Sequence, residues 1–202
     1  MTNHEIYDVD SRTFQQWHDV RVQSKWHWAT ALRWGIAMQH KVLVIGYGNS
    51  IRGDDAFGPV VADRLEESSQ LPCVSILSRH LLTPELAENI RDARLVIFVD
   101  ASADGAVGQV LCRRIYPDPG ASMSMAHHLE PGGLLLWTQE AYQRSPEAYM
   151  VSTRGAAFEF ADAELSPAVA AAVPVAVQQI RELILGSLIP GSLIPGLLIP
   201  GS

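Results

Sequence analysis

The sequence predicts an α/β fold in three layers, in which a mostly parallel, twisted sheet of about five strands carries helices on both faces. Two uninterrupted apolar runs, Val42–Ile45 and Leu95–Val99, are typical of strands that are covered on both sides. Helical patterns separate these runs, as the crossovers between parallel strands require. With 202 residues and a hydrophobic content of 48%, the chain can bury one good core, so we expect a single domain.

The first strand leads into a glycine-rich loop that ends in two adjacent acids, Asp54 and Asp55. The next segment, Gly58–Glu67, has the apolar spacing of a helix. This order places both acids at the carboxyl end of a strand, the edge where open α/β sheets build their sites. Asp54 is in position to cap the helix, which leaves Asp55 as the candidate functional residue.

A nucleotide-binding interpretation of this loop is not favoured. The dinucleotide fingerprint Gly-x-Gly-x-x-Gly begins at Gly46 and Gly48, but Ile51 stands at the third glycine position. The two acids would also put negative charge where a pyrophosphate needs the positive end of a helix. A rise in melting temperature on adding a nucleotide would revive this interpretation.

A second strand is expected to bring another acid to the same edge. A short strand is predicted at Val74–Leu77, followed by a helix over 82–90 with Thr83 as its cap and Pro84 at its first position. Asp100 follows the second apolar run directly, so it should end the strand that lies beside the first one. Two carboxylates are therefore expected to converge.

The remaining elements complete the sheet and its cover. Ser166 before Pro167 should cap the closing helix, and Pro174 should kink that helix or mark its true start. Two histidines, His127 and His128, stand before a Pro-Gly-Gly loop, and their spacing alone leaves open whether they are ligands or surface residues. The other expected elements are an edge strand at Gln109–Tyr116, a helix at Leu134–Tyr142, a strand at Tyr149–Thr153 and the closing helix at 165–184.

Both ends of the chain differ from the domain, which we expect at 39–185. Residues 1–38 hold four of the five tryptophans, and we interpret them as an extension upstream of a natural start at Met38. The alternative is an aromatic helix over 24–37 that docks on the domain or on a partner. Residues 186–202 repeat Gly-Ser-Leu-Ile-Pro, whose glycines and prolines prevent helix and strand ladder, so this tail is expected to be extended or disordered.

Composition narrows the function classes. The net charge of −7 argues against a nucleic-acid partner. The sequence has no run of about twenty apolar residues that would predict a membrane span, and no secretory signal pattern. Cys73 and Cys112 lack the Cys-x-x-Cys spacing of a redox or zinc site, so we expect reduced thiols in a cytoplasmic protein, which we take to be a monomer.

Residues 41–184 resemble the nickel–iron hydrogenase maturation endopeptidases, which remove a C-terminal extension from the hydrogenase large subunit after its nickel has been inserted. The resemblance implies a phosphorylase/hydrolase-like sheet and a hydrogenase large-subunit precursor as partner. Four motifs carry it: Gly46-Tyr-Gly-Asn49 with the acid pair and Gly58, Asp100-Ala101, His127-His-Leu-Glu-Pro131, and Leu165-Ser-Pro167.

The resemblance implies that Asp55, Asp100 and His127 form the catalytic and metal-recognition site. Two carboxylates and one imidazole suit a divalent metal such as nickel and leave coordination positions open for substrate or water. The implied nickel is the one that the precursor already holds, which would make cleavage a checkpoint for metal insertion. Asp55 stands where some members carry glutamate, and His128 beside His127 leaves the histidine assignment open by one residue.

Other interpretations remain open at this point. Cleavage could use the metal to polarise the scissile carbonyl or activate water, or it could use Asp55 or Asp100 as a general base on water. The same peptidase fold could act on another substrate, as in the germination proteases of spores. From a different class, the domain could be a metal-sensing assembly factor that binds the nickel-loaded precursor without cutting it.

Overall fold

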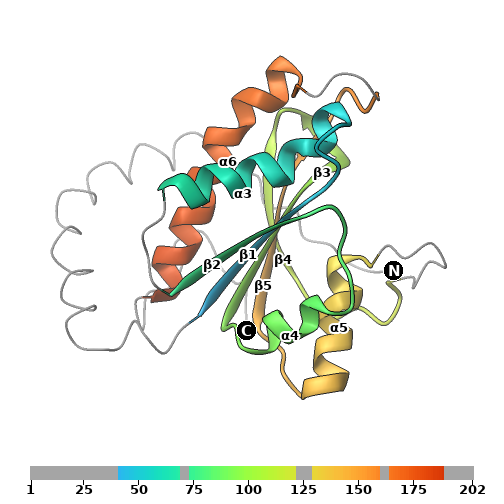
Figure 1. The fold of residues 1–202 in the computed structure, drawn as a ribbon, viewed down its shortest axis with the longest axis vertical. Coiled ribbons are helices and arrows are strands. Elements are labelled where there is room, and N and C mark those ends of the chain that lie inside the picture. The colour runs from blue at the N-terminus through green and yellow to red at the C-terminus, as the bar shows by residue number, and fades with distance from the viewer. Residues whose placement is uncertain (1–40, 69–72, 122–128, 160–163, 189–202) are drawn as a thin grey trace, which may run out of the picture.

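The structure is a computed structural model that describes residues 41–68, 73–121, 129–159 and 164–188, and it has the predicted three-layer α/β fold (Figure 1). The described residues form one five-stranded sheet in the order β2-β1-β3-β5-β4. Neighbouring strands are parallel except at β4, which pairs antiparallel with β5 as the predicted edge strand. The strands are β1 Val42–Tyr47, β2 Val74–Arg79, β3 Leu95–Val107, β4 Val110–Ile115 and β5 Glu147–Arg154.

Helices cover both faces of this sheet (Figure 1). On one face lie α3, Phe57–Ser68, and α6, Pro167–Leu188; on the other lie α4, Leu86–Arg91, and α5, Pro131–Tyr142. Successive side chains of a strand point to opposite faces, so an apolar run supplies both cores at once. Within β1, Val42 and Val44 therefore belong to the α3–α6 core, and the residues between and after them to the α4–α5 core.

Strand β3 is longer than predicted and does not end before Asp100. Its pairing with β1 stops at Val99, opposite Gly46, but its pairing with β5 continues, with Asp100 opposite Ser152. Asp100 consequently lies inside β3 and one residue beyond the last β1 pair. The prediction that Asp100 ends its strand was therefore wrong, because β3 continues beyond it. The prediction that Asp100 lies at the carboxyl end of the pairing with β1 was correct.

The start of α4 also differs from the prediction. The helix begins at Leu86, and Thr83 does not cap it, because Glu85 occupies the N-cap position. Backbone bonds from Leu86 to the Thr83 carbonyl and from Ala87 to the Pro84 carbonyl, at 3.1 and 3.0 Å, form a tighter turn first. This three-residue spacing is that of a 3-10 turn, which commonly leads into an α-helix.

Helix α6 is continuous over 22 residues, and Pro174 neither starts nor divides it. Pro174 is exposed, so its ring faces solvent rather than the core. The stretch Pro167–Ser187 is long and apolar enough to cross a membrane by length and composition alone, with a mean hydropathy of 1.4, as the core helices of many proteins are. In the fold, its inner face, which includes Val169 and Ile180, is buried in the α3–α6 core.

The ends of the chain leave two predictions untested. The helix α6 extends to Leu188, so the first residues assigned to the repeat tail are helical. Residues 189–202 and the tryptophan-rich segment 1–38 lie outside the described residues.

Candidate functional site

Two glycines bring helix α3 onto the sheet and thereby position the acid pair. A Cβ atom on Gly46 would collide with the carbonyl oxygen of Gly58, and a Cβ on Gly58 would collide with the carbonyls of Tyr47 and Val99. The first turn of α3 therefore lies directly on the backbone of β1 and β3. Just before it, the short 3-10 helix η3, Gly53–Ala56, carries both acids.

The glycine-rich loop folds around Asp55. The backbone N–H of Asn49 donates to the Asp55 carboxylate at 3.1 Å. Gly48 has a φ of +136°, which favours glycine, and a Cβ there would collide with the carbonyl oxygen of Asp55 and lie 3.6 Å from Oδ1 of Asp100. The loop, Asp55 and Asp100 thus meet around Gly48, so the structure brings these two predicted site residues to one place.

The environment of Asp100 favours its protonated form. Burial, followed by the negative charge of Asp55, raises the pKa of Asp100 to about 8, although hydrogen bonds from the Ala101 N–H and from Tyr47 partly oppose this. Neighbouring carboxylates commonly share a proton in this way, because two like charges at close range repel. A carboxyl that is mostly neutral at pH 7 beside a second carboxylate can divide the roles of general acid and general base.

Tyr47 is a site residue that the sequence interpretation missed. Its hydroxyl hydrogen-bonds with Asp100, and burial, followed by the negative charge of Asp100, raises the pKa of Tyr47 well above its usual value. In the sequence it is only the variable residue between the two glycines of the motif. Aligning β1 with β3 would have found it, because Gly46 pairs with Val99 and their successors are Tyr47 and Asp100.

Asp54 has a structural role that differs from the predicted helix cap. Its side chain is fully buried and accepts backbone N–H bonds from Ala156, Ala157 and Ser166 at 2.7, 2.9 and 2.7 Å, and a bond from the Ser166 hydroxyl at 2.9 Å. Burial alone would raise the pKa of Asp54, but these hydrogen bonds outweigh it and the pKa is lowered. Asp54 therefore ties η3 to the segment after β5 and to the start of α6.

Ser166 was also predicted as a cap, for helix α6. It does precede the first helical residue, and its carbonyl accepts the N–H of Ala170 at 2.8 Å. Its hydroxyl, however, donates to Asp54. Ser166 of the Leu-Ser-Pro motif thus holds Asp54 in place and also precedes the first residue of α6.

The third predicted ligand, His127, lies outside the described residues, as does His128. Within the described ranges, no three His, Cys, Asp or Glu residues gather in a way that could hold a metal ion. One described neighbour bears on the question: the negative charge of Glu130 contributes to raising the pKa of Tyr47. Glu130, three residues after His127, is therefore within electrostatic range of Tyr47, while the role of His127 stays a prediction.

Solved structures with this fold support the resemblance seen in the motifs. The chain is similar to the hydrogenase maturating endopeptidase HybD from E. coli, with a TM-score of 0.63 and 24% identity over 73% of this chain and 93% of that one. It is also similar to the NiFe hydrogenase maturation protease HycI from Thermococcus kodakarensis, with a TM-score of 0.58 and 26% identity over 72% and 92%.

A third similar structure is the hydrogenase 2 maturation peptidase from a Thaumarchaeota archaeon, with a TM-score of 0.56 and 28% identity over 71% of this chain and 97% of that one. No protein-family model and no curated protein matches the sequence. The predicted fold and the resemblance to hydrogenase maturation proteases are confirmed by these structures.

Proposed function

We propose that this chain is an endopeptidase that removes the C-terminal extension of a nickel–iron hydrogenase large-subunit precursor after nickel insertion. The solved structures that it resembles are proteases, so hydrolysis of a peptide bond is the class of activity that the comparisons support. The observation that carries the proposal to particular residues is the meeting of Asp55 and Asp100 around Gly48 at the carboxyl edge of the sheet.

The two carboxylates supply the chemistry that the reaction needs from the protein. We propose that the carboxylate of Asp55 accepts a proton from the attacking water, while the protonated Asp100 is placed to donate one as the peptide bond breaks. The hydrogen bond with Tyr47 holds the Asp100 carboxyl in place. The assignment of the two roles follows from the raised pKa of Asp100, because only the neutral acid can donate.

Recognition of the precursor is proposed to run through its nickel. Carboxylate and imidazole are suitable ligands for nickel, and we propose that Asp55 and His127 approach the ion that the substrate carries, with Asp100 joining them as a ligand once it has given up its proton. Such an ion would also polarise a nearby carbonyl group. A precursor without nickel would lack this contact, so cleavage would occur only after nickel insertion is complete.

The test is to incubate the purified chain with a large-subunit precursor, with and without nickel, and to follow the intact mass of the precursor. Asp55→Asn and Asp100→Asn are compared with Asp63→Asn, an exposed aspartate on α3 that serves as a matched control. We expect a C-terminal peptide to be lost only from the nickel-loaded precursor, with both site variants slower by at least about a hundredfold and the control unchanged.

Four outcomes would contradict parts of this proposal. Equal cleavage of both precursor forms would remove the nickel checkpoint. Binding of the loaded precursor without shortening would favour a metal-sensing assembly factor, and cleavage of unrelated proteins alone would favour a peptidase with another substrate. Processing at the normal rate by either site variant would remove that residue from the chemistry.

A further inference from the structure

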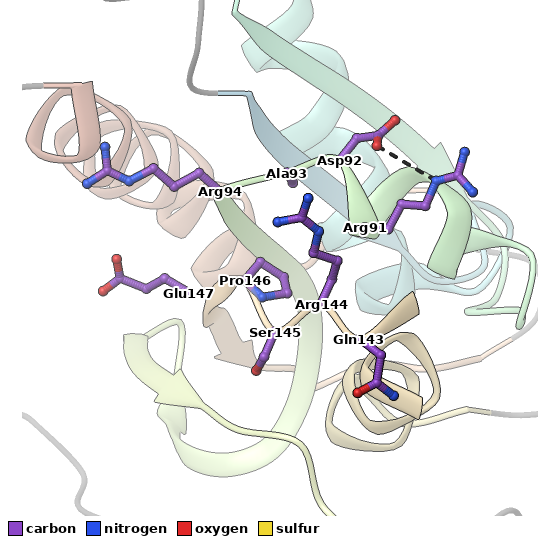
Figure 2. A pocket seen from close by; sticks show the side chains of 9 residues that line it. All are labelled: Arg91, Asp92, Ala93, Arg94, Gln143, Arg144, Ser145, Pro146 and Glu147. Atoms are coloured by element: carbon purple, nitrogen blue, oxygen red, sulfur yellow. Dashed lines mark ion pairs between the residues drawn. The ribbon is translucent and has the colours of Figure 1, made fainter. Parts of the chain in front are cut away.

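A hollow of about 670 Å³ lies beside the amino ends of strands β3 and β5, whereas the acid pair lies at the carboxyl ends of the strands (Figure 2). One wall is the segment 91–94, which connects α4 to β3, and the other is the segment 143–147, which connects α5 to β5. The N–H of Glu147 donates to the carbonyl of Arg94 at 3.0 Å, so backbone pairing joins the two walls. Five residues of β3 separate this end from Asp100, a distance of roughly 17 Å.

Three arginines line the hollow, and one of them is held by its neighbours. Arg91 lies 3.5 Å from Glu88 and 3.7 Å from Asp92, and its guanidinium stacks over the ring of Tyr142 at 4.9 Å. These contacts fix the direction of Arg91. It remains a positive charge at the rim of the hollow.

The two carboxylates of the lining already have cationic partners. Asp92 lies 4.0 Å from Lys41 in addition to its contact with Arg91. Glu147 lies 3.7 Å from Arg114 and accepts the hydroxyl of Tyr149 at 3.0 Å. Neither of these acids forms an ion pair with the two remaining arginines.

Arg94 and Arg144 are these two residues. Within the described part of the chain, neither guanidinium has an ion pair or hydrogen bond. Figure 2 shows the side chain of Arg144 pointing toward the 91–94 segment, while the side chains of Arg91 and Arg94 extend outward on either side of it. A chain with a net charge of −7 thus places three arginines around one hollow.

We propose that this hollow binds a small anion that carries at least two phosphate or carboxylate groups. A guanidinium presents its donors as a planar fork that matches the oxygens of either group, and arginines from two separate segments can hold two such groups at once. The volume falls within the range of small-molecule sites.

Isothermal titration in metal-free buffer at fixed ionic strength tests the proposal, with pyrophosphate and tricarballylate as the phosphate and carboxylate probes. We expect saturable binding at one site for at least one probe. Arg144→Ala and Arg94→Ala should each weaken it by about tenfold or more, because each removes charge-assisted hydrogen bonds. The affinity of Arg144→Lys for the probe should lie between those of the wild type and Arg144→Ala, because lysine keeps the charge but lacks the planar fork of donors.

The matched control is Arg181→Ala, which removes the same charge from an exposed position on α6 outside the hollow. It should leave the affinity within about twofold. The proposal is overturned if neither probe binds saturably, or if Arg181→Ala weakens binding as much as Arg144→Ala. Binding of a tetraglutamate peptide without binding of either probe would likewise overturn it and assign the hollow to an acidic segment of a partner protein.

Discussion

Tyr47 on β1 and Asp100 on the neighbouring strand β3 form a hydrogen-bonded pair, although 53 positions separate them along the chain. The pair exists because β1 and β3 are parallel and in register up to Gly46 and Val99. Asp55 reaches the same place from η3, and its charge raises the pKa of Asp100. The candidate site is thus built from three separate segments that meet at one edge of the sheet.

The raised pKa of Asp100 predicts how stability depends on pH without metal. Between about pH 4 and pH 8 the folded chain holds a proton on Asp100 that the unfolded chain releases, so stability should fall as pH rises through this window. The slope from this group cannot exceed about 1.4 kcal/mol per pH unit. Urea unfolding of the wild type and of Asp100→Asn at a series of pH values measures it, and we expect a flatter curve for the variant.

A parallel pair of curves would contradict this prediction. It would mean that Asp100 titrates alike in the folded and unfolded chain. The proton-donor role proposed for it would then lose its physical basis.

Tyr47→Phe should act through Asp100. The hydroxyl hydrogen bond opposes the upward shift of the Asp100 pKa, so its removal should raise that pKa further. We expect the alkaline limb of the processing profile to move to higher pH and the rate at pH 7 to fall by about tenfold, as the carboxyl loses its orientation. Tyr116→Phe, at an exposed position, is the control. A rate loss with an unchanged pH profile would show that Tyr47 matters for packing alone.

The features that local patterns could predict are those that depend on neighbouring residues in the chain. The apolar runs identify β1 and the buried part of β3, and the glycines of the loop identify the position of Asp55. The extension of β3 past Val99 could not be seen in this way, because it follows from pairing with β5. The same holds for Tyr47, whose partner is known only once the order of the strands is known.

Asp54 shows most clearly which contacts local sequence patterns cannot predict. A cap was the reasonable interpretation from its position before a helix, but its bonding partners lie 102 to 112 residues further along the chain. No local pattern encodes contacts of this range. The hollow between the 91–94 and 143–147 segments was missed for the same reason, since neither segment is unusual by itself.

Asp54→Ala should be strongly destabilising, since it leaves several buried N–H donors without an acceptor. We expect a loss of about 3–5 kcal/mol in the free energy of unfolding at pH 7, measured by urea denaturation. The lowered pKa of Asp54 means that this contribution is present above its unfolded value near 3.8 and is lost as pH falls below it. Asp63→Ala, exposed on α3, should stay within about 0.5 kcal/mol of wild type. Equal effects of the two variants would mean that the Asp54 bonds do not hold the fold.

The histidine assignment can be decided by comparing His127→Ala with His128→Ala in the processing assay. Glu130 is within electrostatic range of Tyr47, and the resemblance to the maturation proteases puts His127 in the ligand position. We therefore expect His127→Ala to lower processing by at least about a hundredfold and His128→Ala to lower it by less than about threefold. Both variants should keep the melting temperature of the wild type, which separates a chemical role from a folding role. If the two effects are reversed, His128 takes the ligand position; if neither variant is impaired, the two carboxylates act without a histidine from this loop.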